Sequence, residues 1–280
     1  MSEFGAHPEA RPGAGRRVLV TGAAGLIGRT TCPGLNARGW SVRGLDKVPL
    51  DGVDGLDDAV VADVQDAAAL DRAMDGVAGV VHLAGIASEA SFPDILAANI
   101  DGTYQVLDAA RRAGVRRFVQ ASSNHAVGYT PRPASGPVGV DVPIRPDTYY
   151  GVSKVFGEAL GRMYVDRYGI EFVALRIGSC LPEPTSPRHL ATWLSLPDCV
   201  RLIHASLTAP DVDFAVAYGI SANTRAWWDL SSARALGYLP VDDAERYAKR
   251  IVAEHGEPDP ADPEIMLIGG DFTGPKYDVR

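Results

Sequence analysis

A tyrosine and a lysine stand four residues apart in the segment Y-G-V-S-K, at Tyr150 and Lys154. On a helix this spacing places both side chains on one face, one turn apart. A phenol with its ordinary pKa of about 10 is a weak base at neutral pH. A nearby ammonium stabilises the phenolate, and lowering the pKa by three requires only ~4 kcal/mol. We therefore predict that Tyr150 is a general base and Lys154 its electrostatic partner, whereas Tyr149 points elsewhere.

Two serines, Ser122 and Ser123, end the apolar segment F-V-Q-A-S-S, which precedes the tyrosine in the chain. If this segment is a strand of a parallel sheet, its carboxyl end lies where such sheets bind their ligands. A serine hydroxyl at that end can hydrogen-bond the reacting oxygen of a substrate. Ser122 is reasonably explained as a turn-forming residue, so Ser123 is the stronger candidate.

A glycine-rich loop, T-G-A-A-G-L-I-G, runs from Thr21 to Gly28 directly after an apolar segment. The spacing G-x-x-G-x-x-G lets the backbone turn tightly and approach a pyrophosphate, and the helix that follows offers free N–H groups and the positive end of its dipole. Asp46 lies 18 residues beyond Gly28, at the end of the next predicted strand. A carboxylate there accepts both ribose hydroxyls and repels a 2′-phosphate. The cofactor is therefore predicted to be NAD rather than NADP, a preference that Lys47 weakens slightly.

Further residues of the predicted cofactor site follow the third and fourth strands. Asp63 and Val64 can meet the adenine edge, although Asp63 is explained equally well as a helix N-cap. Small residues after the fourth strand leave room for a ribose. The NAD-binding residues predicted from the glycine loop and these strand ends are Gly22, Ala24, Gly25, Leu26, Ile27, Gly28, Asp46, Lys47, Asp63, Val64, Leu83, Ala84 and Gly85.

Short apolar segments alternate with amphipathic stretches from residue 17 onward. This pattern indicates a parallel sheet wound on both sides, so we predict an α/β fold with a Rossmann-type doubly wound parallel sheet. The proline of the C-P-G segment at residues 32–34 predicts a kink or an early stop in the first helix. The predicted strands are residues 18–21, 41–45, 59–62, 79–83, 117–121 and 172–176. The predicted helices are residues 25–38, 66–75, 92–113 and 147–168.

The chain divides into four predicted parts. Residues 1–15, rich in Gly, Ala, Pro and charge, are predicted to be a disordered leader. Residues 16–177 form the NAD-binding Rossmann domain. Residues 178–255, with Pro- and Trp-containing loops and short helices, are predicted to be a small C-terminal substrate lobe with returning helices. Residues 256–280 form a C-terminal extension, which is expected to pack on a neighbouring subunit or on the chain's own lobe.

The composition excludes several classes of function. The chain has 280 residues, 46% of them hydrophobic and 22% charged, as in soluble globular proteins. Its net charge of −8 opposes binding to nucleic acid. No apolar stretch approaches the roughly 20 residues of a membrane span. Three cysteines without C-x-x-C spacing fit a reduced, cytoplasmic protein. His82, His125, His189 and His204 show no zinc-ligand spacing, so no metal is predicted.

Together these motifs resemble the extended short-chain dehydrogenase/reductase family over residues 17–255. Four further segments resemble the uronate dehydrogenases more specifically, and three of them lie outside the cofactor signature. They are S-S-N-H-A-V-G-Y at residues 122–129, R-I-G-S-C-L-P-E-P at 176–184, R-H-L-A-T-W-L-S at 188–195, and A-N followed by W-W-D within 222–229.

The resemblance implies NAD-dependent oxidation of hexuronic acids, such as glucuronate and galacturonate, at the anomeric carbon to aldarolactones. Arg188 has the planar fork that holds a carboxylate by two parallel hydrogen bonds. Ala87 stands where the family often has a serine. Ser88 follows it, an offset of one residue that can turn the hydroxyl away from the substrate. The substrate-binding residues that the resemblance implies are Ser88, Ser123, Asn124, His125, Tyr150, Ser179 and Arg188. The resemblance also adds Tyr150, Lys154 and Ile177 to the predicted NAD-binding residues.

Two functions other than the oxidation of a small sugar acid stay open. One is a nucleotide-sugar epimerase or dehydratase of the same superfamily, although the part after Ile177 is short for gripping a nucleoside diphosphate. The other is a non-catalytic NAD-sensing protein, against which the intact Ser123, Tyr150 and Lys154 argue. Helices equivalent to residues 92–113 and 147–168 commonly pair in this superfamily, so we expect a homo-oligomer, a dimer or larger.

Overall fold

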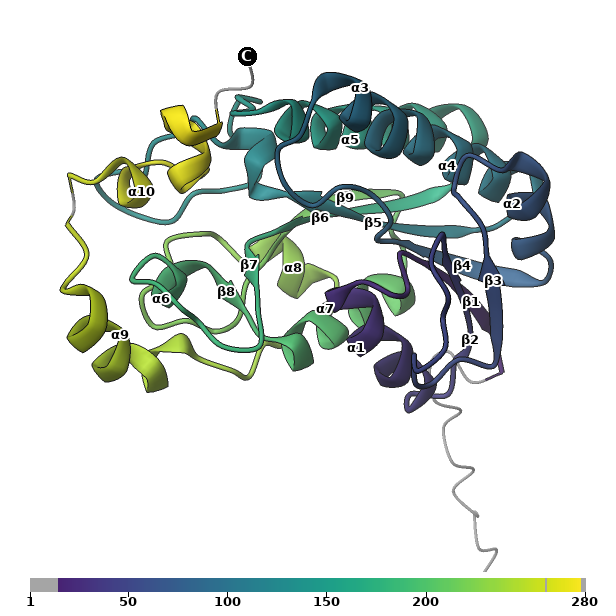
Figure 1. The fold of residues 1–280 in the computed structure, drawn as a ribbon, viewed down its shortest axis with the longest axis horizontal. Helices are drawn as coiled ribbons and strands as arrows, with labels where there is room; N and C mark the ends of the chain where they lie inside the picture. The colour runs from purple at the N-terminus through teal and green to yellow at the C-terminus, as the bar shows by residue number, and fades with distance from the viewer. Residues whose placement is uncertain (1–14, 260, 278–280) are drawn as a thin grey trace, which may run out of the picture.

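The computed structural model describes residues 15–259 and 261–277, so residues 1–14 of the predicted leader lie outside the described residues. A seven-stranded parallel sheet forms the centre, in the order β3-β2-β1-β4-β5-β6-β9 (Figure 1). The order reverses between β1 and β4, where such sheets open a ligand crevice at their carboxyl ends. The strands are β1 (Arg17–Thr21), β2 (Ser41–Asp46), β3 (Asp58–Val61), β4 (Val77–His82), β5 (Arg117–Ser123), β6 (Glu171–Ile177) and β9 (Phe214–Gly219).

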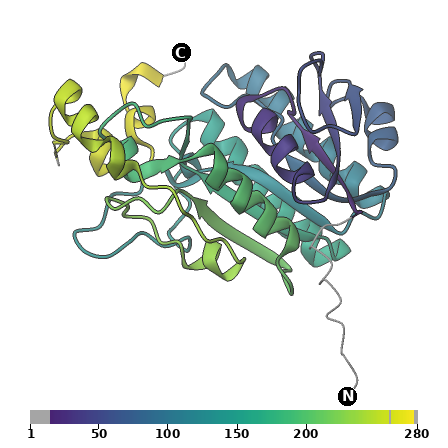
Figure 2. The same cartoon turned by 90° about the horizontal axis from the view of Figure 1, so that it is seen from below.

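Helices cover both faces of this sheet, which confirms the predicted Rossmann-type fold (Figure 1). Successive side chains of a strand point to opposite faces. Val18 and Val20 of β1 therefore enter a core shared with α1 and α7, whereas Leu19 enters one shared with α2, α4 and α5. Figure 2 shows α1 and α7 side by side on their face. The helices are α1 (Leu26–Asn36), α2 (Ala67–Ala73), α4 (Gly102–Arg112), α5 (Tyr149–Tyr168) and α7 (Leu196–Thr208).

The helix predicted for residues 92–113 consists of three joined elements. A π-helical turn, η1 (Leu96–Asp101), separates α3 (Phe92–Ile95) from α4. Asn99 in this turn binds both the N–H and the C=O of Ile86, in the loop after β4, and its Nδ2 lies 3.1 Å from Oγ of Ser153 in α5. Such turns are frequent at functional sites. Here the turn ties the loop after β4 to α5.

The first helix continues through Pro33 to Asn36, so the early stop predicted at residues 32–34 is wrong. Proline removes one hydrogen bond from the turn. Packing on both sides of it keeps the helical path, because Cys32 and Leu35 are fully buried and Gly34 packs closely against Val200 of α7.

The chain returns to the sheet beyond the predicted boundary at residue 177. β9 pairs in parallel with β6 along its whole length, and α7 covers the sheet beside α1. The sequence F-A-V-A-Y-G of β9 carries an ordinary strand pattern, but Pro- and Trp-containing loops surround it. The predicted lobe of residues 178–255 is therefore interrupted. Its remaining elements are β7 (Ser179–Cys180), α6 (His189–Thr192), β8 (Trp193–Leu194), α8 (Ser231–Ala235), η3 (Ala244–Tyr247) and α9 (Ala248–His255).

The C-terminal extension packs on its own chain. Leu267 forms an antiparallel bridge with Pro131, and the N–H groups of Ile268 and Gly269 donate to the carbonyls of Thr130 and Gly128. This places the extension against the segment that follows β5 (yellow in Figure 1). Its short helices are α10 (Pro263–Met266), η4 (Gly270–Thr273) and η5 (Pro275–Tyr277).

Candidate active site

A cavity of about 660 Å³ opens at the carboxyl ends of the strands. The glycine loop, the ends of β2, β4, β5 and β6, and the first turns of α5 line it. Of the predicted NAD-binding residues only Ala24 is absent from the wall, and its N–H donates to Asp46 at 3.0 Å. The predicted residues that line the cavity are Gly22, Gly25, Leu26, Ile27, Gly28, Asp46, Lys47, Asp63, Val64, Leu83, Ala84, Gly85, Tyr150, Lys154 and Ile177.

The glycine loop has no room for side chains. Gly22 has φ +71°, and a Cβ built there would lie 2.7 Å from the backbone nitrogen of Ala84. A Cβ on Gly28 would run into the carbonyl of Gly22. α1 begins at Leu26, so the N–H groups of its first turn belong to residues of the cavity wall. This cradle fits the pyrophosphate of a dinucleotide.

Asp46 ends β2 at the cavity wall, as predicted from its spacing. Its carboxylate accepts from the N–H of Ala24 at 3.0 Å and of Val48 at 3.3 Å, which fixes its orientation. Each carboxylate oxygen has a second lone pair, so the group can still accept from ribose hydroxyls. The residues present therefore fit NAD, and the charge of Asp46 disfavours the phosphate of NADP.

Tyr150 and Lys154 lie one turn apart on α5, which Thr148 caps by accepting from the N–H of Gly151 at 3.1 Å. The Lys154 ammonium lies 5.2 Å from the centroid of the Tyr150 ring and donates to the carbonyl of Ala121 at 2.9 Å. Burial raises the pKa of Tyr150 to about 12, although a hydrogen bond with Ser123 lowers it in part. Burial also lowers the pKa of Lys154 to about 8.

The phenol therefore does not have the lowered pKa that the sequence predicts. The physical reason is that Tyr150 is only 8% exposed, and removing a phenolate from water outweighs the groups that stabilise it. The pair is placed as predicted, but the base needs further positive charge in the cavity to ionise at neutral pH.

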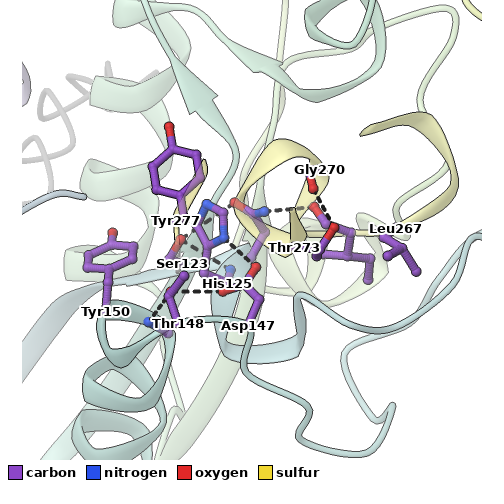
Figure 3. A network of polar contacts seen from close by, with 12 residues as sticks. Ser123, His125, Asp147, Thr148, Tyr150, Leu267, Gly270, Thr273 and Tyr277 are labelled. Carbon is purple, nitrogen blue, oxygen red and sulfur yellow. Dashed lines mark hydrogen bonds and ion pairs between the residues drawn. The ribbon is translucent and has the colours of Figure 1, made fainter. Parts of the chain in front are cut away.

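Three predicted substrate-binding residues continue from β5 into the turn η2 (Asn124–Val127). Ser123 accepts from the N–H of His125 at 3.3 Å, and Nδ2 of Asn124 donates to the carbonyl of Ile268 at 2.9 Å. Nδ1 of His125 lies 2.7 Å from Asp147 (Figure 3). All three side chains line the cavity with Tyr150.

The other three predicted substrate residues do not line this cavity. Ser88 is exposed, and Ala87 stands in the wall in its place. Ser179 shares a hydrogen bond of 2.9 Å with Thr192. Arg188 donates to the backbone carbonyls of the C-terminal extension.

The partners of Arg188 are the carbonyls of Glu264 at 2.5 Å, Leu267 at 3.1 Å and Ile268. Burial lowers the pKa of Arg188 to about 10, so the guanidinium stays charged at neutral pH. Arg188 lines a second cavity of about 390 Å³, together with Arg132 and Trp227.

Sequence reasoning missed Glu89, whose carboxylate binds the start of α5. Its two oxygens accept from the N–H groups of Tyr149 at 3.1 Å and Tyr150 at 2.7 Å. Negative charge at a helix N-terminus is favourable. No local pattern signals this contact, because 60 residues separate the partners in the chain.

Residues 15–259 and 261–277 contain no group of three or more His, Cys, Asp or Glu residues arranged to hold a metal ion. No helix within those ranges is long and apolar enough to cross a membrane.

Comparison with known proteins agrees with this geometry. The NAD dependent epimerase/dehydratase family matches residues 18–196. A uronate dehydrogenase of Agrobacterium fabrum (strain C58) is 45% identical over 258 residues, which cover 92% of this chain and 97% of that protein. The crystal structure of a mutant uronate dehydrogenase from Agrobacterium tumefaciens complexed with NAD has a TM-score of 0.85 and 44% identity, over 92% of this chain and 97% of that chain. A glucuronic acid dehydrogenase from Chromohalobacter salexigens has a TM-score of 0.86 and 41% identity, over 94% of this chain and 99% of that chain.

Proposed function

The chain belongs to the NAD-dependent epimerase/dehydratase family and, within it, to the uronate dehydrogenases, and we propose on this basis that it oxidises hexuronic acids such as glucuronate and galacturonate at the anomeric carbon to aldarolactones. One observation carries the proposal. Tyr150, Lys154 and Ser123 share a single cavity with the glycine cradle and with the Asp46 carboxylate.

The chemistry divides between the cofactor and the side chains. NAD, when bound, accepts the hydride from the anomeric carbon. Tyr150, as phenolate, takes the proton of the anomeric hydroxyl, and Ser123 hydrogen-bonds the same oxygen. The positive charge of Lys154 favours the phenolate, and its ammonium donates hydrogen bonds to the ribose of NAD. One C–H and one O–H bond break as a carbonyl forms, so a cyclic uronate gives a lactone.

Arg188 holds the carboxylate of the sugar in this proposal. A guanidinium has five N–H donors, and three of them already bind carbonyls of the extension. Among the residues that the structure describes, none accepts from Nε, and one hydrogen of Nη2 is also left. These two donors are available to the oxygens of a carboxylate. A neutral sugar leaves them unpaired, which disfavours it.

The decisive assay follows NADH formation with glucuronate, galacturonate, glucose and a UDP-sugar. Turnover of the uronates alone supports the proposal. Tyr150→Phe is expected to lower kcat by at least about 10³-fold while leaving NAD affinity unchanged, because it removes the base and leaves the cradle intact. The matched control is Tyr149→Phe, whose side chain is 41% exposed. Uronate turnover by Tyr150→Phe at the unmodified rate contradicts the assignment of the base.

The same assay distinguishes the two other functions. Activity on the UDP-sugar alone would identify a nucleotide-sugar enzyme. NAD binding without turnover of any of these sugars would identify a sensing protein. Either outcome rejects the proposed uronate oxidation.

We also propose a homo-oligomer and a cytoplasmic location. Large apolar side chains are exposed along α3, η1, α4 and α5, where a second copy can cover them. They are Phe92, Leu96, Tyr104, Tyr149, Val152, Met163 and Tyr168. A monomer in analytical ultracentrifugation would reject the oligomer. Cys32, Cys180 and Cys199 are free thiols, which suits a reducing compartment, and cell fractionation tests the location.

A further inference from the structure

Asp147 carries a fully buried carboxylate beside the proposed sugar site. Its Oδ2 lies 2.7 Å from Nδ1 of His125, whose side chain is 13% exposed. Its Oδ1 accepts from the hydroxyl of Thr148 at 2.9 Å, and Thr148 caps α5. Figure 3 shows His125 with Asp147 on one side and Tyr150 on the other. Asp147 therefore connects the catalytic helix to the imidazole.

Backbone encloses the carboxylate of Asp147 closely. Gly128, Gly151 and Gly269 pack around the carboxylate, and a Cβ on Gly128 or Gly269 would run into Oδ2. These glycines come from three separate segments of the chain. A buried carboxylate is stable only when it is hydrogen-bonded, and His125 and Thr148 supply its hydrogen bonds here.

Aromatic rings fix the plane of the imidazole. Phe272 stacks on His125 with centroids 4.1 Å apart, and Tyr277 stacks on Phe272 at 4.0 Å. The edge of the imidazole meets the ring of Tyr150, with centroids 5.7 Å apart. A 180° flip of the His125 ring would keep this stack and break the bond to Asp147.

A carboxylate accepts hydrogen bonds and does not donate them, so the ring nitrogen facing Asp147 must carry a proton. In neutral imidazole the other nitrogen, Nε2, then carries a lone pair. Residues 15–259 and 261–277 provide no hydrogen-bond partner for Nε2, and His125 lines the cavity.

We propose that Asp147 is a positioning residue that keeps His125 in the Nδ1–H tautomer, so that Nε2 accepts a hydrogen bond from a hydroxyl of the bound sugar. This inference rests on the proposed function for the identity of the ligand. It assigns His125 to a hydroxyl of the sugar and not to its carboxylate, because a lone pair repels an anion.

The first test reads the tautomer directly and needs no activity. The chain has six histidines, so ¹⁵N-imidazole NMR can resolve them, and the spectrum of His125→Gln identifies the signals of His125. We expect protonated Nδ1 and unprotonated Nε2 in the unmodified protein, and loss of that pattern in Asp147→Asn. A proton on Nε2 with a bare Nδ1 in the unmodified protein would overturn the proposal.

The second test is a double-mutant cycle on uronate oxidation. Asp147→Asn is expected to lower kcat/KM about 10- to 100-fold through a higher KM, with unchanged affinity for NAD. If Asp147 acts through His125, adding Asp147→Asn to His125→Gln costs little more than His125→Gln alone. Fully additive losses would contradict the proposal. Asp166→Asn removes the same charge from the exposed far end of α5 and serves as the control.

Deoxy-uronates separate this inference from the proposed function. One deoxy analogue should lose affinity with the unmodified protein and not with His125→Gln or Asp147→Asn. Equal discrimination by all three proteins would overturn the inference while leaving uronate oxidation intact. Failure of every uronate to react, with the expected tautomer present, would instead reject only the proposed function.

Discussion

At the scale of single residues, Tyr150 is the proposed base of the reaction, but its raised pKa opposes the loss of its proton. Burial, with a smaller contribution from the charge of Asp147, raises its pKa to about 12. A general base works only in its deprotonated form. The protein therefore relies on Ser123, Lys154 and the positive charge of oxidised NAD to make the phenolate accessible.

The pH dependence of uronate oxidation follows from this arrangement. We expect kcat/KM to rise with pH, because Tyr150 must lose its proton to act as a base and burial raises its pKa. Asp147→Asn removes a negative charge that raises the pKa of Tyr150, so the acidic limb of the profile should move to lower pH. This shift of the pH profile is a separate effect from the higher KM of the variant. An acidic limb at the same pH in both proteins would show that the charge of Asp147 does not affect the base.

His82 gives a second residue-scale prediction, on stability. It bridges Thr21 at 2.8 Å and Thr103 at 3.1 Å, and burial together with the charge of Lys154 lowers its pKa from 6.5 to about 3. The unfolded chain therefore takes up this proton before the folded one. The stabilisation is fully present above pH 6.5 and is lost as the pH falls toward 3, by roughly 3 kcal/mol at pH 4.

Thermal unfolding across this pH range tests the role of His82. Tm should fall steeply with acidification in the unmodified protein, and the slope should be smaller in His82→Gln. His255→Gln alters an exposed histidine at the end of α9 and is the control. Identical slopes for the unmodified protein and His82→Gln would contradict this account.

At the scale of elements, α5 must be held against the sheet because it carries the catalytic pair. Glu158 of α5 forms a buried ion pair with Arg176 of β6 at 2.8 Å and accepts from Ser122 of β5 at 2.6 Å. The side chains of the pair are 7% and 4% exposed. Removing one partner leaves an uncompensated buried charge, which is strongly destabilising.

Glu158→Ala should therefore lower the free energy of unfolding by about 3–5 kcal/mol. The ion pair of Asp166 with Arg162 on the same helix has side chains 53% and 55% exposed. Asp166→Ala should lower the free energy of unfolding by less than about 1 kcal/mol. Urea unfolding of both variants measures the difference, and equal losses would show that burial does not govern the strength of these pairs.

The sequence was sufficient for elements whose signals are local. The glycine spacing, the strand ends and the four-residue step from Tyr150 to Lys154 placed most of the cavity wall, because backbone periodicity alone fixes those positions. The sequence of β9 has a strand pattern, but this pattern does not show that the strand joins the central sheet. Its pairing with β6 and the helix that covers it are set by tertiary packing. The predicted helix of residues 25–38 continues through Pro33 without the early stop, because burial against α7 overrides local propensity.

Residues whose positions depend on distant contacts could not be placed. Arg188 meets carbonyls 76 to 80 residues further along the chain, and Glu89 meets amides 60 and 61 residues away. No periodicity or spacing records such contacts. Asp147 was missed because polar residues are common where a helix begins, as it does in the predicted helix of residues 147–168. Its partner His125 lies 22 residues earlier.

At the scale of the whole molecule, the two halves of the site come from different parts of the chain. Every residue that lines the large cavity lies between Gly22 and Cys180. The groups that hold Arg188 and stack on His125 belong to residues 264–277. Binding of NAD and binding of the sugar should therefore respond differently to loss of the C-terminal extension.

Truncation after residue 260 tests this separation. It removes the three acceptors of Arg188 and the ring stacked on His125, so KM for glucuronate should rise by about 10-fold or more. The dissociation constant of NAD, measured by fluorescence titration, should stay within about twofold, because the glycine cradle is untouched. A KM equal to that of the full chain would show that the extension does not support the sugar site.

The distance along the chain between Arg188 and its carbonyl acceptors also sets an order of events during synthesis. A ribosome releases the glycine cradle before the residues that fix the guanidinium. An unfinished polypeptide can thus acquire its dinucleotide while its grip on a sugar acid is still weak. A product terminated before residues 264–277 would therefore sequester coenzyme while turning it over inefficiently.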